Sequence, residues 1–185
     1  RLPLWDRRVQ RIAQRTTGMK EVEKGIQFMK EAEGAVAEPF RAATLLDSAD
    51  DCFDRANHIV KDLALPQQIE TVGKLVPLVI GVAVEADNGQ ARINPPAQKY
   101  EMEKSPTDKI RFTAEGRARF EAHRREWTEF AERVEACLEI LAKLEKRHPE
   151  ALVPQQELYV KLKRSAADKF PDIRKHFETM LKQYK

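Results

Sequence analysis

The chain has 185 residues, of which 42% are apolar and 34% are charged, and its formal net charge is +3 at pH 7. This length predicts one domain, or a domain with an appendage, that buries a sizeable core. So small a net charge does not by itself indicate nucleic acid as a partner. Two cysteines exclude a disulfide framework, and the apolar run 75–84 is too short to span a bilayer.

Charge is distributed unevenly along the chain. Residues 1–24 carry seven Lys or Arg against three acids, whereas residues 25–66 carry four against eight. Residues 155–185 are basic again, with eight Lys or Arg against four acids. Both ends are therefore basic, and one early segment is acidic.

The two cysteines indicate the redox state of the compartment in which the protein is found. Cys52 and Cys137 both lie within helical apolar patterns, so we expect buried thiols in a reducing, cytoplasmic environment. No signal peptide is visible. Because the chain opens at Arg1 without a Met, two alternatives stay open: a trimmed chain and a fragment of a larger protein.

Apolar spacing predicts helices over the first third of the chain. Residues 4–37 form either one bent helix or two shorter ones, because the spacing slips around Gly18. Pro39 ends this segment, since the residue before a proline avoids the helical region. Residues 40–64 form a second helix, whose alanines would let a partner helix approach closely.

An acidic cluster lies on this second helix. The run Asp50-Asp51-Cys52-Phe53-Asp54 resembles the D-D-x-x-D motif of isoprenoid synthases, which bind diphosphate through Mg²⁺. Such carboxylates share a helix face and can hold a hard cation, so Asp50, Asp51 and Asp54 are a candidate metal site. The second acidic motif of those enzymes is absent, and we favour a solvated acidic face, with no cofactor.

Residues 67–112 are interpreted as a connecting segment. Asn88-Gly89, flanked by short apolar arms, is the strongest hairpin signal in the chain, and Lys99–Glu103 and Lys109–Phe112 are further extended candidates. A small β-hairpin or ribbon between helices is therefore expected. A wholly helical structure over 67–86 stays open, because short apolar runs do not distinguish strand from helix.

The most regular pattern of the chain lies between Arg117 and Arg147. Apolar or aromatic residues occupy the a and d positions of four heptads: Phe120, Trp127, Val134 and Leu141 at one, and His123, Phe130, Cys137 and Leu144 at the other. This pattern predicts a helix roughly 45 Å long, with Thr113 as its N-cap and Pro149 as its stop. We expect His123 and Cys137 to be packing residues, because they lie too far apart to share a metal.

The C-terminal part predicts further helix. A helix can begin at Pro154, and Phe170-Pro171 should kink or break it before it continues to the C-terminus. Basic residues on this part, together with those near the N-terminus, form a candidate phosphate-contacting surface if the two ends meet. They are Arg7, Arg8, Arg11, Arg15, Lys161, Arg164, Lys169, Arg174 and Lys175.

One short stretch resembles a known family. The run from Ile110 to Gly116, continuing to Phe120 and Trp127, is similar to the passage from the wing strand to the next helix in PadR-type winged-helix regulators. The upstream helix-turn-helix of that family is not recognisable, and residues 1–66 predict long helices instead. The resemblance therefore implies a local strand-to-helix passage and no function.

Together these patterns predict a mainly α protein. We expect an elongated bundle of four or five helices, some coiled-coil-like, with a small β-ribbon, in which residues 113–185 form one domain with residues 1–66. The absence of a catalytic set in the sequence favours a non-enzymatic protein–protein interaction or scaffolding module, which binds a protein partner or self-associates through its helices. The alternatives are a nucleic-acid-binding protein using the basic ends and a metal-dependent helical enzyme at the Asp-rich face. No membrane partner is expected.

Overall fold

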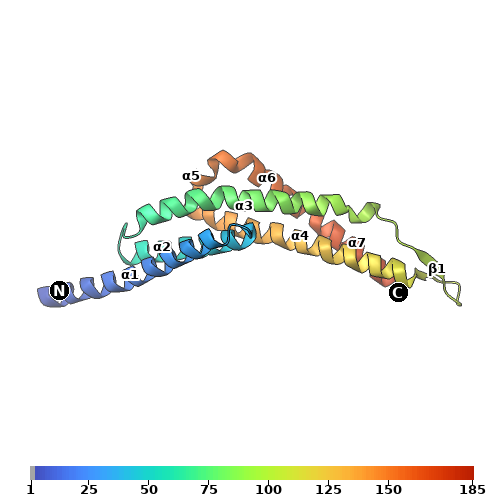
Figure 1. Cartoon of the computed structure of the whole chain (residues 1–185), viewed down its shortest axis with the longest axis horizontal. Coiled ribbons are helices and arrows are strands. Elements are labelled where there is room, and N and C mark those ends of the chain that lie inside the picture. The colour runs from blue at the N-terminus through green and yellow to red at the C-terminus, as the bar shows by residue number, and fades with distance from the viewer. Residues whose placement is uncertain (1–2) are drawn as a thin grey trace. The chain divides into compact units, whose positions relative to one another are not determined.

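The computed structural model describes residues 3–185 and shows a mainly helical chain with one small antiparallel ribbon (Figure 1). This agrees with the fold class predicted from the sequence. The principal elements are α1 (Leu4–Gly34), α2 (Pro39–Ile59), α3 (Leu65–Ile93), β1 (Met102–Lys104), β2 (Ile110–Phe112), α4 (Ala114–Arg147), α5 (Pro149–Leu152), α6 (Gln156–Arg164) and α7 (Phe170–Gln183).

The chain divides into two compact units. Unit 1 comprises the residues up to Val79 together with Leu144–Val153, and unit 2 comprises Ile80–Lys143 together with Pro154–Lys185. Helices α3 and α4 each contribute residues to both units.

In unit 1, α1 is one continuous helix that packs along α2 (Figure 1). The close approach depends on small residues of α1. A Cβ atom added at Gly18 would lie 2.6 Å from Leu63 Cδ2, and one added at Gly25 would lie 2.4 Å from Phe53 Cε1. Phe53 is fully buried in the small core of this unit. The slip in spacing near Gly18 therefore marks the start of the α2 contact and not a break between two helices.

Helix α3 continues through Pro77, within the stretch 67–86 for which the sequence left strand and helix open. A proline inside a helix removes one hydrogen bond and crowds the carbonyl four residues earlier. That carbonyl belongs to Gly73, and both Gly73 and Pro77 are exposed, so water can satisfy it. Leu75, Val76 and Val79 of the same stretch are buried, and this burial outweighs the local penalty.

The hairpin predicted at Asn88-Gly89 is wrong, because both residues lie inside α3. Gly89 instead permits close packing within unit 2, where an added Cβ would lie 2.6 Å from Phe130 Cε1. Ala83, Ala86 and Gln90 are buried at helical spacing. Tertiary packing on one helix face thus overrides the turn preference of an Asn-Gly pair.

The ribbon lies later in the connecting segment. Strands β1 and β2 pair antiparallel, with Met102 opposite Phe112 and Lys104 opposite Ile110. These strands fall within or beside the two weaker extended candidates of the sequence. The ribbon then leads directly into α4, whose Gly116 N–H donates to Thr113 Oγ1 over 3.0 Å, so the predicted N-cap is confirmed.

Helix α4 supplies the core of unit 2 with the residues of its heptad stripe. Phe120, Trp127 and Val134 are fully buried, and the Trp127 ring packs edge-on against Phe170 of α7 at 5.5 Å between centroids. Cys137 is also buried, as the sequence predicts, and burial raises the pKa of its thiol to about 11. The stripe is thus a packing surface.

A buried polar chain joins three elements of this unit. Trp127 Nε1 donates to Gln90 Oε1 over 3.1 Å, and Gln90 Nε2 donates to Asp87 Oδ1 over 3.1 Å. The Ser165 hydroxyl donates to the same Asp87 oxygen over 2.6 Å. Ser165 opens a π-helical turn, Ser165–Lys169, between α6 and α7, which is where the predicted break near Pro171 occurs.

Candidate interaction surface

The N-terminal part of α1 extends away from every packing contact. Residues 3–17, which we call the arm, are exposed without exception, and burial begins at Gly18. The arm is nevertheless helical from Leu4 onward. It therefore presents about four helical turns to solvent on all sides.

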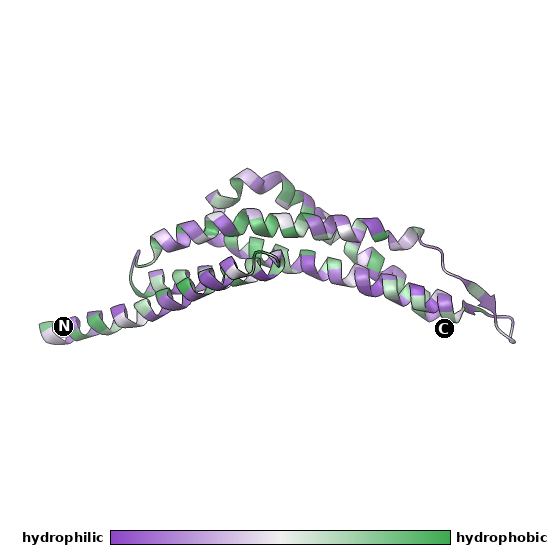
Figure 2. Cartoon of the chain, in the orientation of Figure 1, coloured by the Kyte–Doolittle hydropathy of each residue, from purple (hydrophilic) through white to green (hydrophobic). Residues whose placement is uncertain are grey.

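Large apolar side chains form a line along this helix. Trp5 is 72% exposed and Ile12 is 66% exposed, and the same heptad position continues with Met19 and Ile26. Val9, 50% exposed, lies between the first two. We call Trp5, Val9, Ile12, Met19 and Ile26 the exposed stripe. Hydrophobic bands recur along α1 as far as its N-terminal end (Figure 2).

The exposed stripe lies on a different face of α1 from the surface that packs against α2. The α2-facing residues Gly18, Gly25 and Ala32 are also seven residues apart, but they lie about a third of a turn from the stripe. Thr16 lies seven residues after Val9 and so falls on the same face of the helix. Its hydroxyl donates to the Ile12 carbonyl over 2.9 Å, so its polar group is satisfied within the helix. Helix α1 thus has two apolar faces, of which one packs against α2 and the other is exposed to solvent.

The predicted basic residues near the N-terminus all lie on the arm. Arg7, Arg8, Arg11 and Arg15 are exposed, and within residues 3–185 no acidic side chain forms an ion pair with any of them. The arm has a single acid, Asp6, and therefore carries an excess of three positive charges. Its apolar line is consequently bordered by arginine.

The predicted basic residues near the C-terminus lie in unit 2, on α6, the π-helical turn and α7. Lys161, Arg164, Lys169 and Lys175 are exposed. Arg174 differs, because its guanidinium pairs with Glu135 of α4 and lies over the Trp127 ring at 5.7 Å from the centroid. Arg174 therefore has an internal partner. The N-terminal and C-terminal sets belong to different units.

The predicted acidic site has a structure that the sequence did not suggest. Asp50 is fully buried, so the expectation of a solvated acidic face is wrong at this position. Arg147, at the end of α4, donates through Nη1 to Asp50 Oδ2 over 3.1 Å and to Asp51 Oδ1 over 2.7 Å. Its Nε lies 3.5 Å from Asp54 Oδ2. One guanidinium thus forms ion pairs with all three candidate metal ligands.

The other oxygen of Asp50 is also fully bonded. Asp50 Oδ1 lies 3.2 Å from His148 Nε2 and accepts from Gln68 Nε2 over 3.1 Å. Asn57 extends the network, donating to Gln68 Oε1 over 2.8 Å and accepting from the Ala64 N–H over 2.6 Å. We call this set, with Asp51, Asp54 and Arg147, the polar network; it joins α2, α3 and the end of α4 within unit 1.

The network shifts two pKa values in opposite directions. Burial raises the pKa of Asp50, but hydrogen bonds from His148, Gln68 and Arg147 and the charge of His148 outweigh it, so the pKa lies below its ordinary value. The pKa of His148 is raised, chiefly by its hydrogen bond to Asp50. Both shifts favour a charged pair. The network is a structural clamp, and among the described residues no group of three His, Cys, Asp or Glu side chains is arranged to hold a metal ion.

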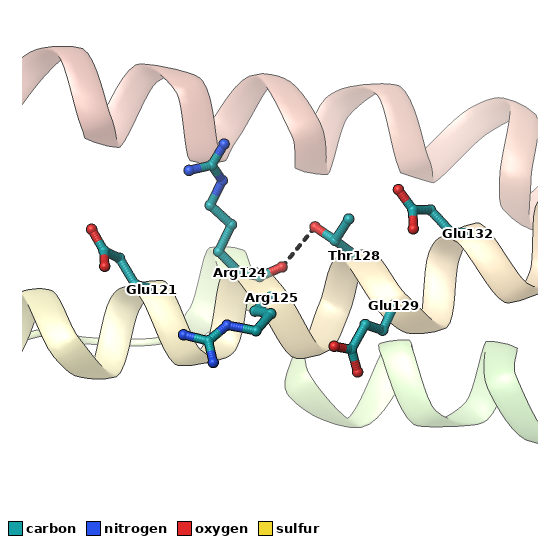
Figure 3. Close-up of a pocket in the computed structure, with 6 residues that line it drawn as sticks. All are labelled: Glu121, Arg124, Arg125, Thr128, Glu129 and Glu132. Atoms are coloured by element: carbon teal, nitrogen blue, oxygen red, sulfur yellow. Dashed lines mark hydrogen bonds between the residues drawn. The ribbon is translucent and has the colours of Figure 1, made fainter.

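Two further hollows lie away from the arm. One, of about 580 Å³, lies on α4 and is lined by Glu121, Arg124, Arg125, Thr128, Glu129 and Glu132 (Figure 3). The two arginines extend to opposite sides of the helix in Figure 3, and the Thr128 hydroxyl donates to the Arg124 carbonyl over 2.7 Å. The charged residues that line this hollow are of both signs and all lie on α4. They therefore do not form a site of one charge around a ligand.

The second hollow lies within unit 1 between α1, α2 and α3. It encloses about 380 Å³ and is mainly apolar, with Met29, Leu46 and Leu78 among its lining residues and Glu33 and Lys74 as its charged ones.

These features define a helical protein with an open, arginine-bordered apolar helix face. The chain matches no protein-family model, no curated protein and no solved structure at a significant level. Among residues 3–185, no helix combines the length and the apolar character needed to cross a membrane.

Sequence spacing alone could have revealed part of this surface. The seven-residue interval joining Trp5, Ile12, Met19 and Ile26 is present in the sequence, although the slip at Gly18 divides it into two apparent stripes. Arg147 and His148 gave no such signal. Their partner Asp50 is almost a hundred residues away, and only the fold brings them together.

Proposed function

We propose that the protein is a non-enzymatic helical interaction or scaffolding module that binds a protein partner through the arm. The observation that carries this proposal is the exposed stripe, which begins on the arm, where residues 3–17 are exposed on all sides and pack against no other described residue. A line of large apolar side chains on a monomer's surface marks an interaction site more often than scattered single exposures do.

Helix physics supports the same function. Isolated helices of about four turns are marginal in water, and most helical stability in proteins comes from packing an apolar face. The arm has such a face, and residues 3–17 have no packing partner in the described chain. A partner helix would cover the stripe and stabilise the arm. Both cysteines are buried thiols, which fits action in the reducing cytoplasm.

Affinity capture with two variants tests the proposal. Ile12→Asp places a charge in the exposed stripe, whereas Ile69→Asp makes the same change at a 64% exposed position on α3 of the same unit. We expect Ile12→Asp to lose bound proteins that the wild type and Ile69→Asp retain, with sedimentation or light scattering recording self-association in parallel. A chain that is strictly monomeric and captures the same proteins with and without Ile12→Asp would contradict the proposal.

Nucleic-acid binding is a second candidate, favoured by the four unpaired arginines of the arm. Lys or Arg side chains without internal partners can neutralise phosphates, with a salt-dependent affinity. Mobility shifts at low salt test this, comparing wild type with Arg7→Glu/Arg11→Glu, which changes arginines away from the exposed stripe. A shift that the double variant abolishes would support this candidate. Absence of any shift, or indifference to the variant, would dispose of it.

A further inference from the structure

We infer that the partner of the arm is an acidic amphipathic helix, which packs on the exposed stripe as the second strand of a short coiled coil. This inference rests on the proposed function and adds the chemistry of the partner. It follows from the seven-residue spacing of the stripe and from the charges on both sides of it.

The spacing of the stripe is that of a coiled-coil seam. Trp5, Ile12, Met19 and Ile26 are separated by seven residues each, and Val9 and Thr16 lie four residues after the first two. Alternating steps of four and three are the a and d positions of a heptad repeat, whose side chains insert between those of a facing helix. A flat groove or a globular partner would not require this period. The stripe therefore indicates a helix as its occupant.

The residues beside the seam determine which helix it accepts. With Val9 at a and Ile12 at d, Arg8 and Arg15 occupy g positions, and Asp6 and Lys20 occupy e positions, so three of these four charges are positive. Side chains at e and g form the ion pairs that set partner choice in coiled coils. Among the described residues, no acidic side chain forms an ion pair with Arg8 or Arg15, so both are available to a partner. Glu or Asp at the partner's e and g positions would satisfy them.

The same charges disfavour a second copy of the chain. In a parallel pair, Arg15 of one copy would face Lys20 of the other. In an antiparallel pair, Arg8 would face Arg15 twice, offset in part by Asp6 with Lys20. Each arm also carries an excess of three positive charges, which adds a longer-range repulsion. Charge complementarity thus selects a different, acidic helix over self-association.

Titration calorimetry of the full chain with two synthetic peptides tests the inference. Both peptides have four heptads with Leu at a and d; one has Glu at every e and g position, and its twin has Lys. We expect the Glu peptide to bind at least tenfold more tightly than the Lys peptide. Ile12→Asp should weaken this binding at least tenfold, Ile69→Asp should leave it unchanged, and Arg8→Glu/Arg15→Glu should reverse the preference toward the Lys peptide.

Other outcomes separate this inference from the function on which it rests. Equal binding of both peptides, lost in Ile12→Asp, would overturn the acidic partner and leave the interaction function standing. A dimer of the chain alone that Ile12→Asp dissociates would do the same and identify a second copy as the occupant. If neither peptide binds, while vesicles of phosphatidylserine and phosphatidylcholine bind the wild type and not Ile12→Asp, both the inference and the protein-binding function would be overturned.

Discussion

The two halves of α1 show how one helix can belong to a folded unit at one end and remain open at the other. From Gly18 onward, small residues every seven positions admit α2, and a Cβ at Gly25 would strike the Phe53 ring. At the equivalent positions of the arm stand Arg11 and Leu4, which leave no room for so close an approach. The apolar stripe on the other face continues through both halves.

Charge follows the same division. In the packed part of unit 1, the carboxylates Asp50, Asp51 and Asp54 share the guanidinium of Arg147. In the arm, the arginines have no acidic partner within the described chain. Clustered charge therefore stabilises the fold in one region and stays exposed to solvent in the other.

Removing the centre of the polar network should have the largest effect. Arg147→Met leaves the buried carboxylate of Asp50 without its guanidinium, and breaking a buried ion pair in this way costs about 3–5 kcal/mol. Urea unfolding followed by circular dichroism measures the loss. The control is Arg117→Met on the same helix, whose exposed pair with Glu121 should contribute no more than about 0.5 kcal/mol. Equal losses in the two variants would show that the network does not clamp unit 1.

Filling the contact between α1 and α2 should have the next largest effect. Gly25→Leu forces a side chain against the buried Phe53 ring, and overpacking of this kind costs about 1–3 kcal/mol. Gly73→Leu is the matched control, because an added Cβ there meets nothing within 4 Å. Replacing glycine by a better helix former should stabilise the helix by up to about 1 kcal/mol. Thermal unfolding should show a lower midpoint for the first variant and an equal or higher one for the second. A stable Gly25→Leu would contradict the described packing of α1.

The pH dependence of stability should show how much the pairing of His148 with Asp50 contributes to folding. Its pKa is raised in the folded state by Asp50, so its contribution is fully present below the unfolded value of about 6.5 and is lost as pH rises through the folded pKa. The wild type should thus lose stability to urea between pH 5.5 and 8.5, and His148→Gln should lose less. Asp50 has a lowered pKa, so its contribution is present above about pH 4 and is lost only at lower pH. Identical profiles for the two proteins over pH 5.5–8.5 would refute the pairing.

Changes on the arm should have the smallest effect on folding. Ile12 is 66% exposed, so Ile12→Asp should alter the free energy of unfolding by no more than about 0.5 kcal/mol, as expected for a surface site. Circular dichroism at several urea concentrations checks this. A loss above about 2 kcal/mol would mean that the arm is part of the folded core and not a free surface.

The sequence predicted the regular parts of this structure well. The heptad stripe of α4, from Phe120 to Leu144, is strongly periodic, and periodicity reports burial on one helix face. The cap at Thr113 and the break near Pro171 depend on local chemistry, which the sequence also contains. Residues 102–112 were correctly expected to include extended structure.

The failures have a common physical cause, which is contact between distant residues. Asn88-Gly89 has the chemistry of a turn, but Gly89 is needed beneath Phe130, which lies on another helix. Asp50 appeared to face water, although it lies four residues after Leu46 and three before Phe53 and so borders the buried face. Its ion partner Arg147 could not be assigned from local spacing. For the same reason, the polar network could not be predicted from the acidic motif.

Hydrogen exchange of the arm's backbone amides tests the central claim most directly. Residues 5–17 should exchange rapidly in the free chain, because nothing packs on them, while amides between Gly18 and Ala32 should be protected. Adding the Glu peptide should protect residues 5–17 in the wild type and not in Ile12→Asp. Strong protection of the arm in the free monomer, or no change when the peptide is added in excess, would contradict the claim that the arm is the binding surface.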